Sequence, residues 1–176
     1  MGKLLDFSKL GLFFEKKFNG RIYRISYYVA YPTEGTRPKN DIDKLHKFLT
    51  YLKKGLGYHI VKKPLKTIYL RNAEGKLIYD QIIDQPASIE KGNLDVEITI
   101  DAIRYSGTYD IAIFLTGDSD FLALINYLRN LDNPKKVFIF STENCISVEL
   151  RTGSDGYFDI RNFKELHGVK LLKKNK

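Results

Sequence analysis

The segment from Asp110 to Leu128 limits the possible folds more than any other part of the chain. Residues 110–115 are mostly apolar, with β-branched and aromatic side chains, which is typical of a strand buried on both faces of a parallel sheet. After the turn at Gly117, apolar residues recur at helical spacing: Phe121, Leu124, Ile125 and Leu128. A strand that passes through a short turn into a helix predicts an α/β fold.

The same alternation of strand and helix patterns extends over the whole chain. The spacing predicts helices over 7–18, 41–54, 121–128 and 144–151 and after Gly92, and strands over 21–30, 58–61, 136–140 and 157–160. Segments 67–71 and 77–79 are expected to form an inserted β-hairpin. Short connections between alternating elements favour a mostly parallel sheet in a single domain, residues 1–165, followed by a basic extension, residues 166–176.

Acidic residues occur where three separated segments begin a helix. Asp118 and Asp120 follow the strand at 110–115, Asp95 lies in the first turn of the helix after Gly92, and Asp6 precedes the helix over 7–18. An acid at a helix start is often only a cap, with Asp118 or Ser119 as the candidate here. In open α/β sheets, however, ligands bind at the carboxyl ends of strands, and carboxylates in such a crevice suit Mg²⁺ or Mn²⁺.

The ordered motifs of the chain resemble those of the NYN domain, a family of the PIN-like nuclease superfamily. The most specific pair is Lys91-Gly-Asn-Leu-Asp95-Val and Thr116-Gly-Asp-Ser-Asp120-Phe. The resemblance extends to Asp6-Phe-Ser-Lys9-Leu and to Ser147-Val-Glu-Leu followed by Asp155 and Phe158. The family's usual first motif is Asp-Gly-x-Asn, so this sequence departs from it at Phe7 and Lys9.

The resemblance implies a three-layer α/β/α sandwich and a metal-dependent ribonuclease. Matched motif by motif, the catalytic and metal-binding acids would be Asp6, Asp95, Asp118 and Asp120, holding Mg²⁺ or Mn²⁺. A smaller set of side chains is expected to support the site: Asp101, Thr116, Ser119 and Lys9. Metal-assisted hydrolysis of this kind needs bound divalent ions and an activated water, and it needs no His or Cys nucleophile.

The net charge of +8 favours a polyanionic partner; RNA is the first candidate and DNA the second. Between residues 62 and 91, cations alternate with tyrosines such as Tyr69 and Tyr79, which places phosphate contacts near surfaces suited to base stacking. The expected nucleic-acid contacts are Lys62, Lys63, Lys66, Arg71 and Lys91. A solvated basic face is the alternative for the same residues.

Other features limit the class of protein. The single cysteine, Cys145, excludes an internal disulfide framework and suits a reducing compartment, and no apolar run approaches a membrane span. We therefore expect a cytoplasmic protein without a membrane partner, and a homodimer stays open as its assembly. Two other functions stay open: an RNA-binding protein of the same fold that does not cleave, and a different Mg²⁺-dependent phosphoryl hydrolase.

Overall fold

The structure, a computed structural model, describes residues 5–32, 37–80 and 84–168. The chain divides into two compact units, Met1–Ile25 with Glu97–Lys176, and Ser26–Val96. Residues 169–176, most of the predicted basic extension, lie outside the described part of the chain. The predicted mixed α/β fold with parallel strands and small antiparallel insertions is confirmed.

The first unit is built around a parallel sheet of three strands in the order β7-β8-β9. Its elements are α1 (Phe7–Phe18), α3 (Asp95–Arg104, whose first two residues fall in the other unit), β7 (Ile111–Phe114), α4 (Leu122–Arg129), β8 (Lys136–Ser141), α5 (Val148–Gly153) and β9 (Gly156–Asp159), with short 3₁₀ turns at Ser106–Thr108, Ser119–Phe121, Ile160–Asn162 and Lys164–Leu166. Successive strands are joined by helices, as the sequence pattern predicts.

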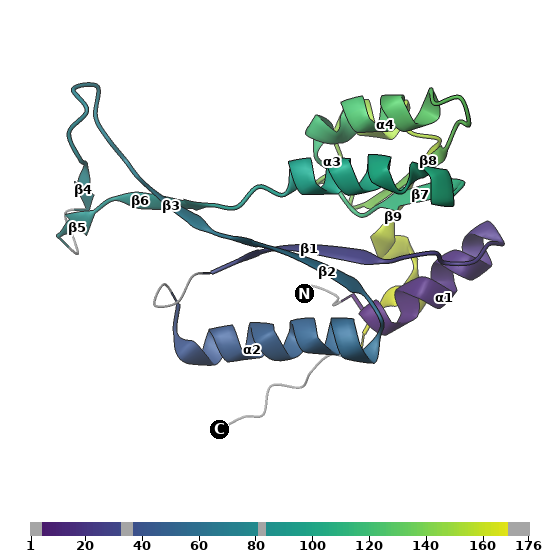
Figure 1. The fold of residues 1–176 in the computed structure, drawn as a ribbon, viewed down its shortest axis with the longest axis horizontal. Coiled ribbons are helices and arrows are strands. Elements are labelled where there is room, and N and C mark those ends of the chain that lie inside the picture. The colour runs from purple at the N-terminus through teal and green to yellow at the C-terminus, as the bar shows by residue number, and fades with distance from the viewer. Residues whose placement is uncertain (1–4, 33–36, 81–83, 169–176) are drawn as a thin grey trace. The chain divides into compact units, whose positions relative to one another are not determined.

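Alternating side chains of β8 face two different helix layers. Val137 and Ile139 are fully buried in a cluster with Leu124, Ile125 and Leu128 of α4. Phe140 points to the other face, where it packs against Leu10 and Phe14 of α1; the rings of Phe14 and Phe140 lie 5.0 Å apart. The sheet therefore lies between α1 on one face and α4 on the other, which is the three-layer arrangement (Figure 1).

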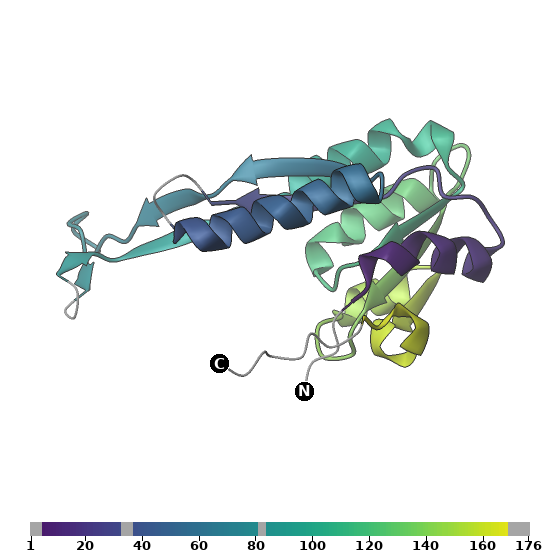
Figure 2. The same ribbon diagram turned by 90° about the horizontal axis from the view of Figure 1, so that it is seen from below.

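The second unit contains a parallel pair of strands and an antiparallel ribbon. Strand β1 (Ser26–Tyr31) pairs with β2 (His59–Pro64), and the chain between them forms α2 (Lys39–Thr50) and one π-helical turn (Tyr51–Gly55). Helix α2 runs along this pair in both views (Figures 1 and 2). The ring of Phe48 in α2 packs edge-on against the ring of Tyr27 in β1, with 5.8 Å between the ring centres. The predicted strand over 21–30 thus begins only at Ser26, and the predicted helix over 41–54 begins earlier, at Lys39.

The inserted hairpin pairs differently from the prediction. Strand β3 (Lys66–Tyr69) pairs with β6 (Ser88–Lys91), and β4 (Tyr79–Asp80) pairs with β5 (Gln85–Pro86). The two segments that were expected to form the hairpin are joined at their near ends, by an isolated bridge between Arg71 and Leu77 and by a hydrogen bond of 3.0 Å from the backbone N–H of Ile78 to the carbonyl of Leu70. The segment 84–91 was not recognised as strand because it contains a proline and several polar residues, and its pairing depends on contacts distant in sequence.

Candidate metal centre

Three acidic side chains from two helix starts come together. One carboxylate oxygen from each of Asp95, Asp118 and Asp120 lies within 4.8 Å of the others. Asp118 and Asp120 are exposed and Asp95 is half-buried, so the group is open to solvent. The sequence predicted all three as strand-end or helix-start acids, and the structure places them in one group.

The loop after β7 fixes the positions of Asp118 and Asp120. The hydroxyl of Thr116 accepts a hydrogen bond of 3.2 Å from the backbone N–H of Asp118. The Asp118 carboxylate in turn accepts one of 3.1 Å from the backbone N–H of Asp120, and this bond caps the 3₁₀ turn that leads into α4. The predicted capping role of Asp118 is therefore confirmed, and the same side chain also belongs to the acidic group.

Asp95 is held at the first position of α3. The side-chain oxygen of Asn93 accepts a hydrogen bond of 2.7 Å from the backbone N–H of Asp95. Further along the helix, Ile98 and Ala102 pack against the core formed by α4 and β8. Sequence reasoning missed the role of Asn93, although an Asn two residues before a helix start is a recognised signal for this type of turn.

Asp6 is not a member of this acidic group. It caps α1: its carboxylate accepts bonds from the backbone N–H of Ser8 at 3.1 Å and from the Ser8 hydroxyl at 2.6 Å. Lys9 lies 3.4 Å from the same carboxylate and also donates to the carbonyl of His167. The Ser8 hydroxyl, together with Lys9, lowers the pKa of Asp6. The metal-binding role of Asp6 stays a prediction.

The other expected supporting residues have different surroundings. Asp101 lies in α3, where Arg104 approaches its carboxylate to 3.8 Å. Ser119 is exposed at the start of the 3₁₀ turn. Thr116 shapes the loop through its hydroxyl, as described above. Neither Asp101 nor Asp6 joins the acidic group, and the roles of these residues in the reaction stay predictions.

The predicted nucleic-acid contacts all lie in the second unit. Lys62 and Lys63 are on β2, and the ammonium of Lys62 lies 5.0 Å from the centre of the Tyr31 ring. Lys66 and Lys91 are directly opposed in the β3–β6 ribbon. Arg71 follows β3, and its guanidinium donates to the carbonyl of Gly75 at 2.7 Å. The structure therefore distributes these cations over two strand pairs.

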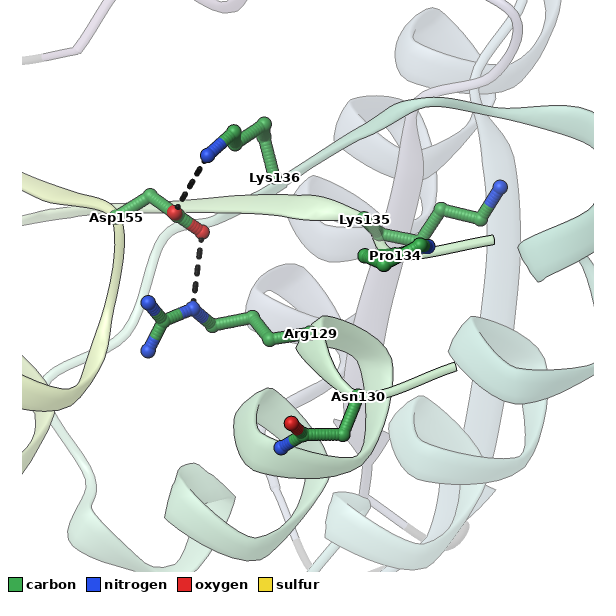
Figure 3. Close-up of a pocket in the computed structure, with 6 residues that line it drawn as sticks. All are labelled: Arg129, Asn130, Pro134, Lys135, Lys136 and Asp155. Atoms are coloured by element: carbon green, nitrogen blue, oxygen red, sulfur yellow. Dashed lines mark hydrogen bonds and ion pairs between the residues drawn. The ribbon is translucent and has the colours of Figure 1, made fainter. Parts of the chain in front are cut away.

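A polar cavity of about 240 Å³ lies where β8 begins, beside Lys136 (Figure 3). Its lining includes Arg129, Lys136 and Asp155. Asp155 is 12% exposed; it accepts a bond from the backbone N–H of Val137 and pairs with Arg129 and Lys136, each at 3.2 Å. These bonds join the end of α4, the start of β8 and the segment before β9, so we assign the Asp155 cluster a structural role.

The acidic group fits a divalent cation such as Mg²⁺ or Mn²⁺. Its donors are all carboxylate oxygens, the ligand type that these hard ions prefer. Oxygens bound octahedrally at ~2.1 Å from an ion lie about 3 to 4 Å apart, and small rotations of exposed side chains bring oxygens within 4.8 Å to that spacing. Three protein ligands leave other positions for water and a substrate phosphate.

Comparison with known proteins agrees with the fold and the motifs. The sequence matches the NYN domain over residues 1–161. A relative among characterised proteins is the low amplitude and bright protein LabA of Synechococcus elongatus, 33% identical over 75 residues, which is 43% of this chain and 39% of the relative. The chain thus spans well under half the length of that relative.

A solved structure shares the fold at low sequence identity. It is the crystal structure of a protein of unknown function from Vibrio parahaemolyticus, with a TM-score of 0.61 and 22% identity, covering 94% of this chain and 83% of that one. Since the family match covers nearly the whole sequence, the chain belongs to the NYN domain family.

Among the described residues, no helix combines the length and apolarity that crossing a bilayer requires.

Proposed function

We propose that the protein is a divalent-metal-dependent nuclease that hydrolyses phosphodiester bonds in RNA. The observation that carries this proposal is the convergence of Asp95, Asp118 and Asp120 in a protein of the NYN family. Three exposed or half-exposed carboxylates in one place repel one another, and a bound cation offsets this repulsion. Such a group has little value for stability alone, which supports a role in metal binding.

Each acid has a definite part in the proposed site. When bound, Mg²⁺ or Mn²⁺ supplies an acidified water and neutralises charge on phosphate oxygens. Asp118 and Asp120 hold that ion from the loop after β7, with Asp118 fixed by its bond to the N–H of Asp120. Asp95 holds it from the start of α3, where Asn93 fixes the backbone. Because the group is open to solvent, a polymer strand can approach it from outside.

RNA binding without cleavage is the second candidate. It is favoured by the position of Asp6, which caps α1 and pairs with Lys9 instead of joining the acidic group. A site with fewer acids holds metal more weakly, whereas the net charge of +8 attracts RNA with or without metal. The two candidates make opposite predictions about cleavage and the same prediction about binding.

Incubation with labelled single-stranded and structured RNA tests the proposal. Reactions contain Mg²⁺, Mn²⁺ or a chelator and compare the native protein with Asp118→Asn and with Asp132→Asn, a control at an exposed acid outside the group. The proposal predicts metal-dependent cleavage that Asp118→Asn abolishes and Asp132→Asn leaves intact. Salt-sensitive binding without cleavage in either metal would support the second candidate, and cleavage that survives in the chelator would exclude the proposed mechanism.

A further inference from the structure

The β3–β6 ribbon presents an uncovered surface. Every residue of Lys66–Tyr69 and of Ser88–Lys91 is exposed, so within the described part of the chain neither face of this strand pair is buried. The two strands run side by side in Figure 1. A ribbon of two strands is only marginally stable in water unless something packs against it. The ribbon is therefore a candidate for binding a partner.

The register defines what one face of the ribbon offers. Lys66 lies directly opposite Lys91, and Ile68 lies directly opposite Ile89. Residues two apart in a strand point to the same side, so these four side chains share one face, which we call the lysine–isoleucine face. Ile68 is 43% exposed and Ile89 is 51% exposed. The face thus consists of a pair of cations beside an exposed aliphatic pair.

Two directly opposed lysines repel each other, and an anion between them reverses that effect. Among the described residues, no acidic side chain pairs with Lys66 or Lys91; the neighbouring Glu90 points to the other face and pairs with Arg37. The lysine pair is thus available for an anion from outside the chain. A single phosphate, with several acceptor oxygens, can accept bonds from both ammonium groups.

We propose that the lysine–isoleucine face binds a single strand of RNA, with one phosphate between Lys66 and Lys91 and a base or ribose against Ile68 and Ile89. The substrate class rests on the proposed function. Unpaired bases are free to contact an apolar surface, whereas a duplex buries its bases in the stack. A second copy of this chain fits the face poorly, because it would bring two more lysines to a surface that already holds two.

Of the nucleic-acid contacts predicted from the sequence, only Lys66 and Lys91 lie on the lysine–isoleucine face. Tyr69 pairs with Ser88 in the register and therefore points to the face opposite the lysine pair. Arg71 already donates to the carbonyl of Gly75, so its guanidinium is partly occupied in the turn. The isoleucine pair, in contrast, was not predicted, because exposed aliphatic residues give no nucleic-acid signal in a sequence.

The test measures RNA affinity in a chelator, with the Asp118→Asn variant as background so that cleavage does not interfere. Fluorescence anisotropy of a labelled single-stranded RNA is recorded over a range of salt concentrations. The double variant Lys66→Ala/Lys91→Ala should reduce the slope of log K against log salt by about 0.7, the value for one phosphate of a single strand that is no longer neutralised. Lys53→Ala/Lys54→Ala, exposed lysines of the π-helical turn, removes the same charge and should leave the slope unchanged.

A second variant tests the apolar contact. Ile68→Ser/Ile89→Ser should weaken single-stranded binding several-fold without changing the salt slope or the weaker binding of duplex RNA. Equal slopes for the two lysine variants, or an isoleucine variant that binds as the background does, would overturn the proposal. The proposal would also be overturned if light scattering showed a dimer that the isoleucine substitutions dissociate. Because no step of this test requires cleavage, failure of the nuclease proposal would leave its outcome readable.

Discussion

Gly117 lies directly against the main-chain carbonyl of Cys145: a Cβ placed on Gly117 would lie 1.9 Å from that oxygen. The carbonyl of Gly117 also accepts a hydrogen bond of 3.0 Å from the backbone N–H of Ser147, at the start of α5. The loop that carries Asp118 and Asp120 is thus fixed against the segment after β8 by a contact between two backbones. Only a residue without a side chain permits it.

Gly117→Ala should therefore displace the loop and weaken metal binding. Because the obstructing atom belongs to the backbone, the clash cannot be relieved by a side-chain rotation, and the acids after Gly117 must move. We expect at least a tenfold loss of Mn²⁺ affinity, the usual scale for disturbing the support of a metal ligand. Titration of Mn²⁺ measures it, with Gly107→Ala as control because a Cβ there meets no atom within 4 Å.

Asn93→Ala should weaken metal binding through Asp95. The substitution removes the acceptor for the N–H of Asp95, and a hydrogen bond of this kind contributes about 1 kcal/mol to stability. The loss of metal affinity should be about tenfold, whereas Asn93→Asp, which keeps the acceptor, should retain the bond. Equal metal affinity for Asn93→Ala and the native protein would show that Asn93 does not position Asp95.

Asp6 offers a test of whether its carboxylate has any role beyond capping. Asp6→Asn keeps a side-chain acceptor for Ser8 and should retain the stability of α1, while Asp6→Ala should lower the midpoint of urea unfolding. If Asp6 only caps the helix, Asp6→Asn should bind Mn²⁺ as the native protein does. A loss of metal affinity in this stable variant would instead place Asp6 in the metal centre.

Asp155 should make stability depend on pH. Burial alone would raise its pKa, but the N–H of Val137 and the cations of Lys136 and Arg129 outweigh burial and lower it. A carboxyl with a lowered pKa in the folded state stabilises at neutral pH, and this contribution is lost as the pH falls below about 4. Asp155→Asn should cost about 2 kcal/mol at pH 7 by urea unfolding, and the difference should shrink in acid.

The exposed Asp132 supplies the control for that measurement. Asp132→Asn changes the same charge at an exposed position and should leave the unfolding free energy nearly unchanged at both pH values. If Asp155→Asn and Asp132→Asn were equally stable at pH 7, the bonds of Asp155 to Arg129 and Lys136 would contribute nothing net.

The alternating elements and the acid pair were predictable because they depend on local signals. The apolar run before Gly117 and the helical spacing after it determine where Asp118 and Asp120 fall, since the carboxyl end of a parallel strand leads directly into the next helix. The grouping of Asp95 with them followed from the family motifs. The absence of Asp6 from the group could not be foreseen. Its carboxylate bonds to Ser8 and pairs with Lys9, and the sequence does not show whether a carboxylate makes such local bonds or binds a metal ion.

The inserted ribbon was less predictable for a different reason. Its strands pair across about twenty residues, and partner choice in such ribbons depends on contacts distant in sequence rather than on the pattern of either strand. The turn that the predicted hairpin requires between residues 71 and 77 does form, with a hydrogen bond of 2.9 Å from the backbone N–H of Gly75 to the carbonyl of Asn72. The turn signal near residue 72 predicts a short hairpin, and it gives no information on the pairing of β3 with β6 further from the turn.

Electron paramagnetic resonance of Mn²⁺ tests the central claim most directly, because free and protein-bound ions give different signal intensities. The native protein and Asp118→Asn are titrated under the same conditions, with Asp132→Asn as the charge-matched control. We expect the native protein and Asp132→Asn to bind Mn²⁺ alike and Asp118→Asn to bind it at least tenfold more weakly. Equal binding by all three proteins would show that Asp95, Asp118 and Asp120 do not form a metal centre.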